Sequence, residues 1–88
     1  MATGETYANY LRDLGYLLRE RAEEATRESR SIRAKRRVEE RTASDAFVEG
    51  RSQAFYEVIS LMHHQAEVFE IPLADLALEG LDPERDLI

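Results

Sequence analysis

Ser60 and His64 are a candidate catalytic pair, because residues four apart lie on one face of a helix. A serine and a histidine can act as a nucleophile and its general base. Such a pair also needs an orienting carboxylate, an oxyanion hole and a cleft, and a narrow bundle made only of helices offers little concavity. The sequence also contains no glycine-rich phosphate loop and no His-Glu-x-x-His motif. We therefore predict no catalytic residues and no enzymatic activity.

Two adjacent histidines, His63 and His64, are the candidate metal ligands. Helical bundles that bind two metal ions place a glutamate three residues before a histidine, but here Ser60 and Leu61 stand at those positions. On a helix the two imidazoles also point about 100° apart, so they do not converge on one ion. The chain has no cysteine, which removes thiolate zinc sites, iron–sulfur clusters and disulfides. We predict no metal site and no cofactor.

Charge is segregated along the chain. Residues 27–41 hold seven basic and three acidic side chains, a net charge of +4, whereas the whole chain of 88 residues carries −6. On a helix, four arginines of this region share one flank: Arg30, Arg33, Arg37 and Arg41. Guanidinium groups pair with carboxylates and phosphates, so this flank is the candidate surface for an acidic protein partner or a nucleic acid.

Two other interpretations of these arginines remain open. They form a solvated helix surface with i,i+4 ion pairs such as Glu23 with Arg27, or they are neutralised in a dimer by the acidic segment from Glu67 onward. The chain has a net negative charge and no RRM, KH or zinc-finger signature. We therefore favour a protein partner and keep nucleic acid as the alternative.

Helices must position all these residues, because the only prolines are Pro72 and Pro83 and no strand pattern occurs. The run from Thr42 to Asp45 predicts a capped helix start near Thr42 or Ser44, and Asp82 with Pro83 predicts another. Gly80 predicts a left-handed helix cap. The expected elements of this single all-α domain are helices at about 5–41, 44–71 and 73–79 and a final turn at about 83–87, with a break at Ser29–Ser31 left open.

The apolar pattern predicts a helical hairpin. The first helix has a stripe that is bulky at its start and thin after Ala22, and we expect residues 7–14 to meet residues 71–76. Apolar residues of the second helix fill about half its circumference, which is too wide for one neighbour. We predict that two chains pair into an antiparallel four-helix bundle; the alternative is that the C-terminal helices cover the open side of a monomer.

Two polar residues, Arg51 and Gln65, interrupt the centre of this apolar arc. Either they fix the register of a dimer seam, or they are partly exposed at the edge of the bundle. The candidate dimer seam contains Arg51, Phe55, Val58, Met62, Gln65 and Phe69. Gly50 and Ala54, one turn apart, predict a close approach to the first helix.

The sequence also indicates the location of the protein and the general class of its function. The longest stretch without a charged residue, Val58 to Ala66, is far shorter than a membrane span, and the first 20 residues carry charges that break a signal-peptide core. We expect a cytoplasmic protein with no membrane contact. The predicted function is protein–protein interaction as a homodimeric adaptor, regulator or inhibitor; the alternative is a regulator that binds nucleic acid through the arginines.

Overall fold

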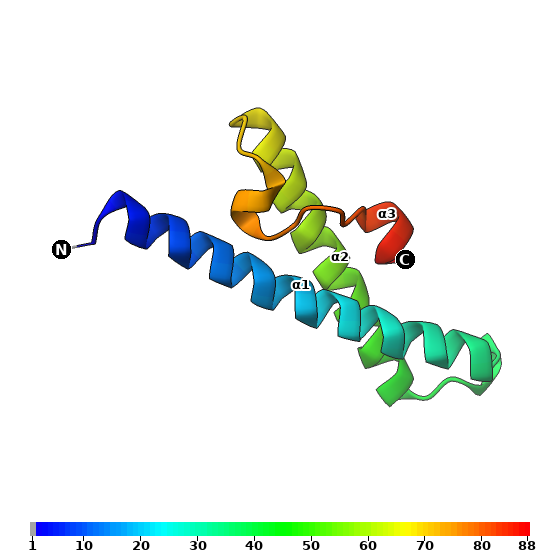
Figure 1. Ribbon diagram of the computed structural model, residues 1–88. Helices are drawn as coiled ribbons and strands as arrows, with labels where there is room; N and C mark the ends of the chain where they lie inside the picture. The colour runs from blue at the N-terminus through cyan, green and yellow to red at the C-terminus, as the bar shows by residue number, and fades with distance from the viewer. Residues whose placement is uncertain (1) are drawn as a thin grey trace.

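The computed structural model describes residues 2–88, which form two long helices packed against each other as a hairpin (Figure 1). The elements, in order, are α1 (Gly4–Lys35), the 3-10 turn η1 (Val38–Glu40), α2 (Ala43–Val68), the 3-10 turn η2 (Leu73–Leu76) and α3 (Pro83–Asp86). No strand occurs within residues 2–88. The predicted all-α class and the helical hairpin are confirmed.

Side-chain caps define the helix starts. The Thr3 hydroxyl accepts a hydrogen bond from the Thr6 amide at the start of α1. Thr42 and Asp45 form a capping box at the start of α2, in which each side chain accepts from the other residue's backbone N–H. Asp82 caps α3 ahead of Pro83. These caps satisfy amide groups that a helix start leaves without an intrahelical acceptor.

The first helix ends at Lys35 rather than near Arg41. It runs without a break through Ser29–Ser31, and Ser29 is buried against the rest of the fold. Arg36 leaves the helix in an extended conformation, and its guanidinium pairs with Asp45 at the start of α2. The end of α1 is therefore set by this tertiary contact and by the space that the chain needs to reverse before the Thr42 cap.

The second helix ends at Val68 rather than near Ile71. Glu70 adopts a left-handed conformation with φ of 55°, and the Ile71 N–H donates to the Ala66 carbonyl at 2.7 Å. This geometry is a Schellman motif, which closes a helix before its chain turns away. The short helix predicted at 73–79 is the shorter turn η2, and its left-handed cap is Ala77 with φ of 56°. Gly80 is left-handed as predicted, with φ of 77°, but it lies beyond the end of this turn.

Small side chains line the contact of α1 with α2. The buried residues of α1 are Gly15, Ala22, Ala25, Thr26 and Ser29. The buried residues of α2 are Asp45, Ser52, Ile59 and Ala66, spaced seven apart. A seven-residue period is typical of helices that stay in contact over a long distance, and small side chains let the two backbones approach closely.

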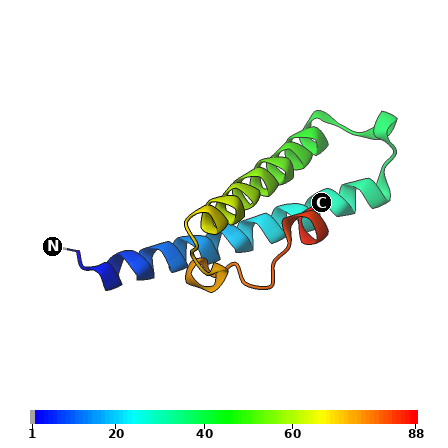
Figure 2. The ribbon, with the colours of Figure 1, turned by 90° about the horizontal axis from the view of Figure 1, so that it is seen from above.

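The C-terminal segment, residues 73–88, folds over one side of the hairpin (Figure 2). Its buried leucines Leu78, Leu81 and Leu87 form one core with Ala22 of α1 and Ile59 of α2. The structure thus contains the arrangement that the sequence analysis held as the alternative for the open side of the hairpin. The acidic C-terminal segment is docked.

The molecule is elongated. Its extents are 52 × 25 × 16 Å and its radius of gyration is 15.5 Å, whereas a compact domain of this length has a radius of gyration of about 12 Å. Helix α1 crosses α2 at an angle, so the start of α1 projects away from the rest of the chain (Figures 1 and 2). Part of the apolar surface of both helices is left uncovered as a result.

Candidate interaction surface

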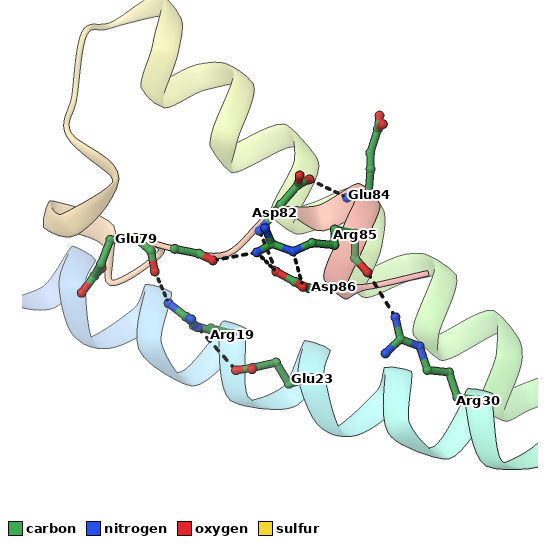
Figure 3. A network of polar contacts seen from close by, with 9 residues as sticks. Arg19, Glu23, Arg30, Glu79, Asp82, Glu84, Arg85 and Asp86 are labelled. Atoms are coloured by element: carbon green, nitrogen blue, oxygen red, sulfur yellow. Dashed lines mark hydrogen bonds and ion pairs between the residues drawn. The ribbon is translucent and has the colours of Figure 1, made fainter.

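Arg19 of α1 holds the C-terminal segment through its main chain. One nitrogen of its guanidinium donates to the Glu79 carbonyl at 2.8 Å and to the Ala77 carbonyl at 3.2 Å (Figure 3). Glu23, one turn further along α1, forms an ion pair with the same guanidinium at 3.4 Å. Arg19 therefore satisfies carbonyl groups of a segment that has little regular structure.

Arg30 makes a second contact of the same kind, about three turns further along α1. It donates to the carbonyl of Arg85 at 3.3 Å (Figure 3). It also donates to the carbonyl of Ile88 at 2.8 Å. The sequence analysis left open that the acidic segment neutralises these arginines in a dimer. Within the single chain, Arg19 and Arg30 bind backbone carbonyls of that segment, which carry no sequence signature.

Carboxylates of the C-terminal segment pair within the segment itself. The guanidinium of Arg85 makes two bonds of 2.8 Å to the Asp86 carboxylate and one of 3.1 Å to the Gly80 carbonyl (Figure 3). The Asp86 carboxylate also accepts from the Asp82 amide at 2.9 Å. These contacts favour the ionised form, so they hold the pKa of Asp86 well below its ordinary value, with the Arg85 hydrogen bond as the largest cause.

The candidate arginine flank does not remain a single open surface. Arg30 binds the C-terminal segment, and Arg41 forms an ion pair of 2.9 Å with Glu49 on α2. Arg33 and Arg37 are exposed near the hairpin turn. Of the four predicted arginines, Arg33 and Arg37 therefore present their side chains to solvent without a contact like that of Arg30 or Arg41.

Asp45 connects the hairpin turn to the start of α2. Its carboxylate accepts from the Thr42 amide at 3.0 Å and pairs with Arg36. The backbone hydrogen bond from Thr42 is the largest cause that holds the pKa of Asp45 below its ordinary value of 3.8, and the Arg36 guanidinium adds to it. The sequence signal for the cap was clear, whereas nothing marked Arg36 as its partner.

Because the pKa of Asp45 is lowered on folding, its ionised form stabilises the folded chain above the unfolded pKa of about 3.9, and this contribution is lost as the pH falls further. We expect Asp45→Asn to lower the urea midpoint at pH 7 and to flatten the loss of stability below pH 4. Urea unfolding at pH 7 and pH 3 measures both effects. Asp75→Asn is the control, since Asp75 is exposed and makes no side-chain cap; equal pH profiles for the two variants would contradict the role of Asp45.

One side of α2, next to the buried line Asp45, Ser52, Ile59 and Ala66, carries most of the candidate dimer seam. We call this side the outer face and define it by the residues Phe47, Arg51, Ala54, Val58, Met62, Gln65 and Phe69, which share one side of the helix. Phe47, Val58 and Phe69 are 73%, 40% and 68% exposed. Met62 is half-buried and packs against the core, as does Phe55, the remaining seam residue. The Arg51 guanidinium lies 5.0 Å from the Phe55 ring centre. Ala54 is exposed, so it does not approach α1 as predicted.

A second uncovered apolar surface lies on the N-terminal arm of α1, residues 4–14. Tyr7, Tyr10 and Leu11 are 61%, 64% and 46% exposed. The sequence analysis placed this arm against residues 71–76, but η2 crosses α1 at Gly15, whose Cα lies under the Leu76 carbonyl. The arm therefore extends beyond the point where η2 crosses α1. Its apolar side chains continue the apolar stripe of α1 that α2 covers further along the helix.

Of the residues considered for chemistry, the two histidines line a hollow on the surface and Ser60 does not. Ser60 is half-buried, whereas His64 is exposed and lines a shallow hollow with His63, Glu67 and Leu73. Among the described residues, no three histidine, aspartate or glutamate side chains are grouped so that they could hold a metal ion. None of the helices in residues 2–88 has the length and apolar content needed to cross a membrane.

Comparison with known proteins adds no relative: no protein-family model, no curated protein and no solved structure matches this chain. The function is therefore argued from the surfaces described above.

Proposed function

We propose that the chain is a non-enzymatic adaptor or regulator that acts through protein–protein interaction and works as a homodimer. The observation that carries this proposal is the excess of accessible surface. The chain exposes 6307 Å², whereas a compact monomer of this mass exposes about 5,300 Å². The excess of about 1,000 Å² is larger than the roughly 800 Å² that each partner buries in an interface of standard size.

The excess surface is apolar in two places, the outer face of α2 and the N-terminal arm of α1. Exposed apolar patches of this kind mark interaction sites in soluble proteins. The outer face of α2 serves the homodimer. The arm, with Tyr7 and Tyr10, serves a further protein partner, because tyrosine is enriched among the residues that contribute most to binding.

The alternative function, binding of nucleic acid, would use the arginine flank. Two of its four residues, Arg30 and Arg41, are engaged in contacts within the chain. Phosphate contacts also require a basic surface, and the whole chain has a net charge of −6. These two facts support a protein partner over a nucleic acid.

Light scattering on a sizing column tests the homodimer, with absorbance read at 260 and 280 nm. We expect twice the chain mass of 10.1 kDa at micromolar concentrations in both low and moderate salt. Val58→Asp should raise the dimer dissociation constant at least about tenfold, because an unpaired charge buried in an interface costs several kcal/mol. Val58 is partly exposed in the single chain, so the fold tolerates this change.

Gln53→Asp is the matched control, since Gln53 is exposed on α2 but lies outside the outer face. It adds the same charge and should leave the dimer intact. A wild-type chain that stays monomeric at all concentrations, or two variants that behave alike, would contradict the proposed homodimer. A heavier species that absorbs strongly at 260 nm and is removed by salt would favour the nucleic-acid alternative.

A further inference from the structure

The spacing of the outer face of α2 is the same when counted from either end. From Phe47 to Phe69 the successive intervals are 4, 3, 4, 4, 3 and 4 residues, with Val58 in the middle. The chemistry follows the same order. Each end carries a phenylalanine, and the polar residues Arg51 and Gln65 each stand seven residues from Val58.

This symmetry matches a helix that packs against a second copy of itself in the opposite direction. A two-fold axis at Val58 places Arg51 opposite Gln65 of the second copy, and Phe47 opposite Phe69 of the second copy. The Arg51 guanidinium is a donor and the Gln65 side-chain carbonyl is an acceptor, so each of the two polar residues of this face gains a hydrogen-bond partner from the second copy.

A parallel arrangement of the same face does not have this property. It places Arg51 against Arg51 in the interior of the interface, where two like charges repel each other. It also aligns Gln65 with Gln65 and leaves both arginines without an acceptor from the opposite helix. The two polar residues therefore favour the antiparallel arrangement.

The charge of the whole molecule favours the same direction. Residues 67–79, at the open end of the hairpin, contain four acidic and no basic side chains, whereas residues 33–41 at the turn have a net charge of +3. Parallel pairing would bring the two acidic ends side by side. Antiparallel pairing separates them and brings each near the basic turn of the other copy, which is the complementarity expected of a specific interface.

We infer that the outer face of α2 binds a second copy of the chain in antiparallel orientation, with a two-fold axis at Val58 and with Arg51 paired to Gln65 of the second copy. This inference rests on the homodimer proposed above and adds its orientation and register. The line of contact from Phe47 to Phe69 is about 33 Å long at the helical rise of 1.5 Å per residue.

Engineered cysteines test the orientation directly, because the chain contains none of its own. A disulfide requires Cβ atoms about 4 Å apart. We expect Val58→Cys to form a covalent dimer under mild oxidation. Phe47→Cys alone and Phe69→Cys alone should not do so, because the axis separates each pair of identical residues by about 33 Å. A mixture of the Phe47→Cys and Phe69→Cys chains should cross-link.

Each other result has a defined meaning. Cross-linking of Phe47→Cys alone and of Phe69→Cys alone would show a parallel dimer, which overturns this inference but keeps the homodimer. A dimer by light scattering that gives no cross-link in any variant would show that another face forms it. A wild-type chain that is monomeric by light scattering would overturn the homodimer itself. Asn9→Cys, exposed on the arm of α1, reports random collisions.

A charge swap provides a second test that needs no thiol. Gln65→Arg places two arginines opposite each other at both ends of an antiparallel interface, so the dissociation constant should rise at least about tenfold. Adding Arg51→Gln to that variant restores one arginine and one glutamine at each pair and should recover most of the affinity. In a parallel dimer the double variant would also recover, because it carries one pair of opposed arginines, as the wild-type chain does. The direction is therefore measured with Arg51→Gln alone, which removes the opposed arginines of a parallel dimer and would lower its dissociation constant, but removes the Arg51–Gln65 contact of the antiparallel dimer. A lower dissociation constant for Arg51→Gln would contradict the inferred register.

Discussion

Replacing Gly15 with alanine is expected to displace the C-terminal segment from α1. An added Cβ would lie 2.8 Å from the Leu76 carbonyl carbon and closer still to its oxygen, and both atoms belong to backbone that cannot rotate away. Alanine favours a helix by about 1 kcal/mol over glycine, so the local effect is stabilising. The clash outweighs it, since crowding of a packed contact typically costs about 1–3 kcal/mol.

We therefore expect Gly15→Ala to lower the free energy of unfolding and to speed amide hydrogen exchange throughout residues 73–88. Gly50→Ala is the matched control. Gly50 is exposed within α2 and has no atom within 4 Å of an added Cβ, so this change should stabilise the chain by about 0.5–1 kcal/mol. Opposite signs for the two substitutions would establish the contact at Gly15. A stabilising Gly15→Ala with unchanged exchange would show that η2 does not pack there.

These two glycines also show where sequence reasoning reached its limit. The sequence analysis placed the close helix approach at Gly50, because Ala54 stands one turn away. The close approach occurs at Gly15, where η2 crosses α1. A helical wheel identifies positions that share a face, but it does not specify which element covers that face. That choice depends on how the chain returns after α2.

The elements themselves could be predicted from local signals. The Thr42 cap and the Asp82–Pro83 start could be predicted because these residue types cap or begin a helix through contacts with the backbone only a few residues away. The end of α1 at Lys35 could not be predicted, because no glycine or proline marks it. It depends on the contact of Arg36 with Asp45, nine residues later.

The candidate interaction surface was also predicted only in part, because some of its features have a signal in the residue types and others do not. The apolar width of α2 indicated a face beyond the one that α1 covers, and the structure leaves Phe47 and Phe69 exposed on it. The role of Arg19 had no such signal. It binds main-chain carbonyls, and any residue type can supply those acceptors.

The core contact of α2 leads to the second large expected effect. Ile59 is fully buried between Ala22 of α1 and the leucines of the C-terminal segment, so three parts of the chain meet at one side chain. Ile59→Ala removes that side chain and leaves a cavity, which should cost about 2–5 kcal/mol. The total stability of a small domain is about 5–15 kcal/mol, so this loss is a large share of it.

Urea unfolding of Ile59→Ala and of Ile59→Val measures this effect, and the valine variant should lose only about 0.5–1.5 kcal/mol. Val58→Ala is the control from the next position, whose side chain points to the outer face of α2. At concentrations too low for the dimer, Val58→Ala should change stability by no more than about 0.5 kcal/mol. Its effect should grow as the protein concentration rises, because mass action links a subunit interface to concentration. The effect of Ile59→Ala arises inside one chain, so the loss of stability should remain at every protein concentration. Equal losses for Ile59→Ala and Val58→Ala would mean that α2 does not separate an inner face from an outer one.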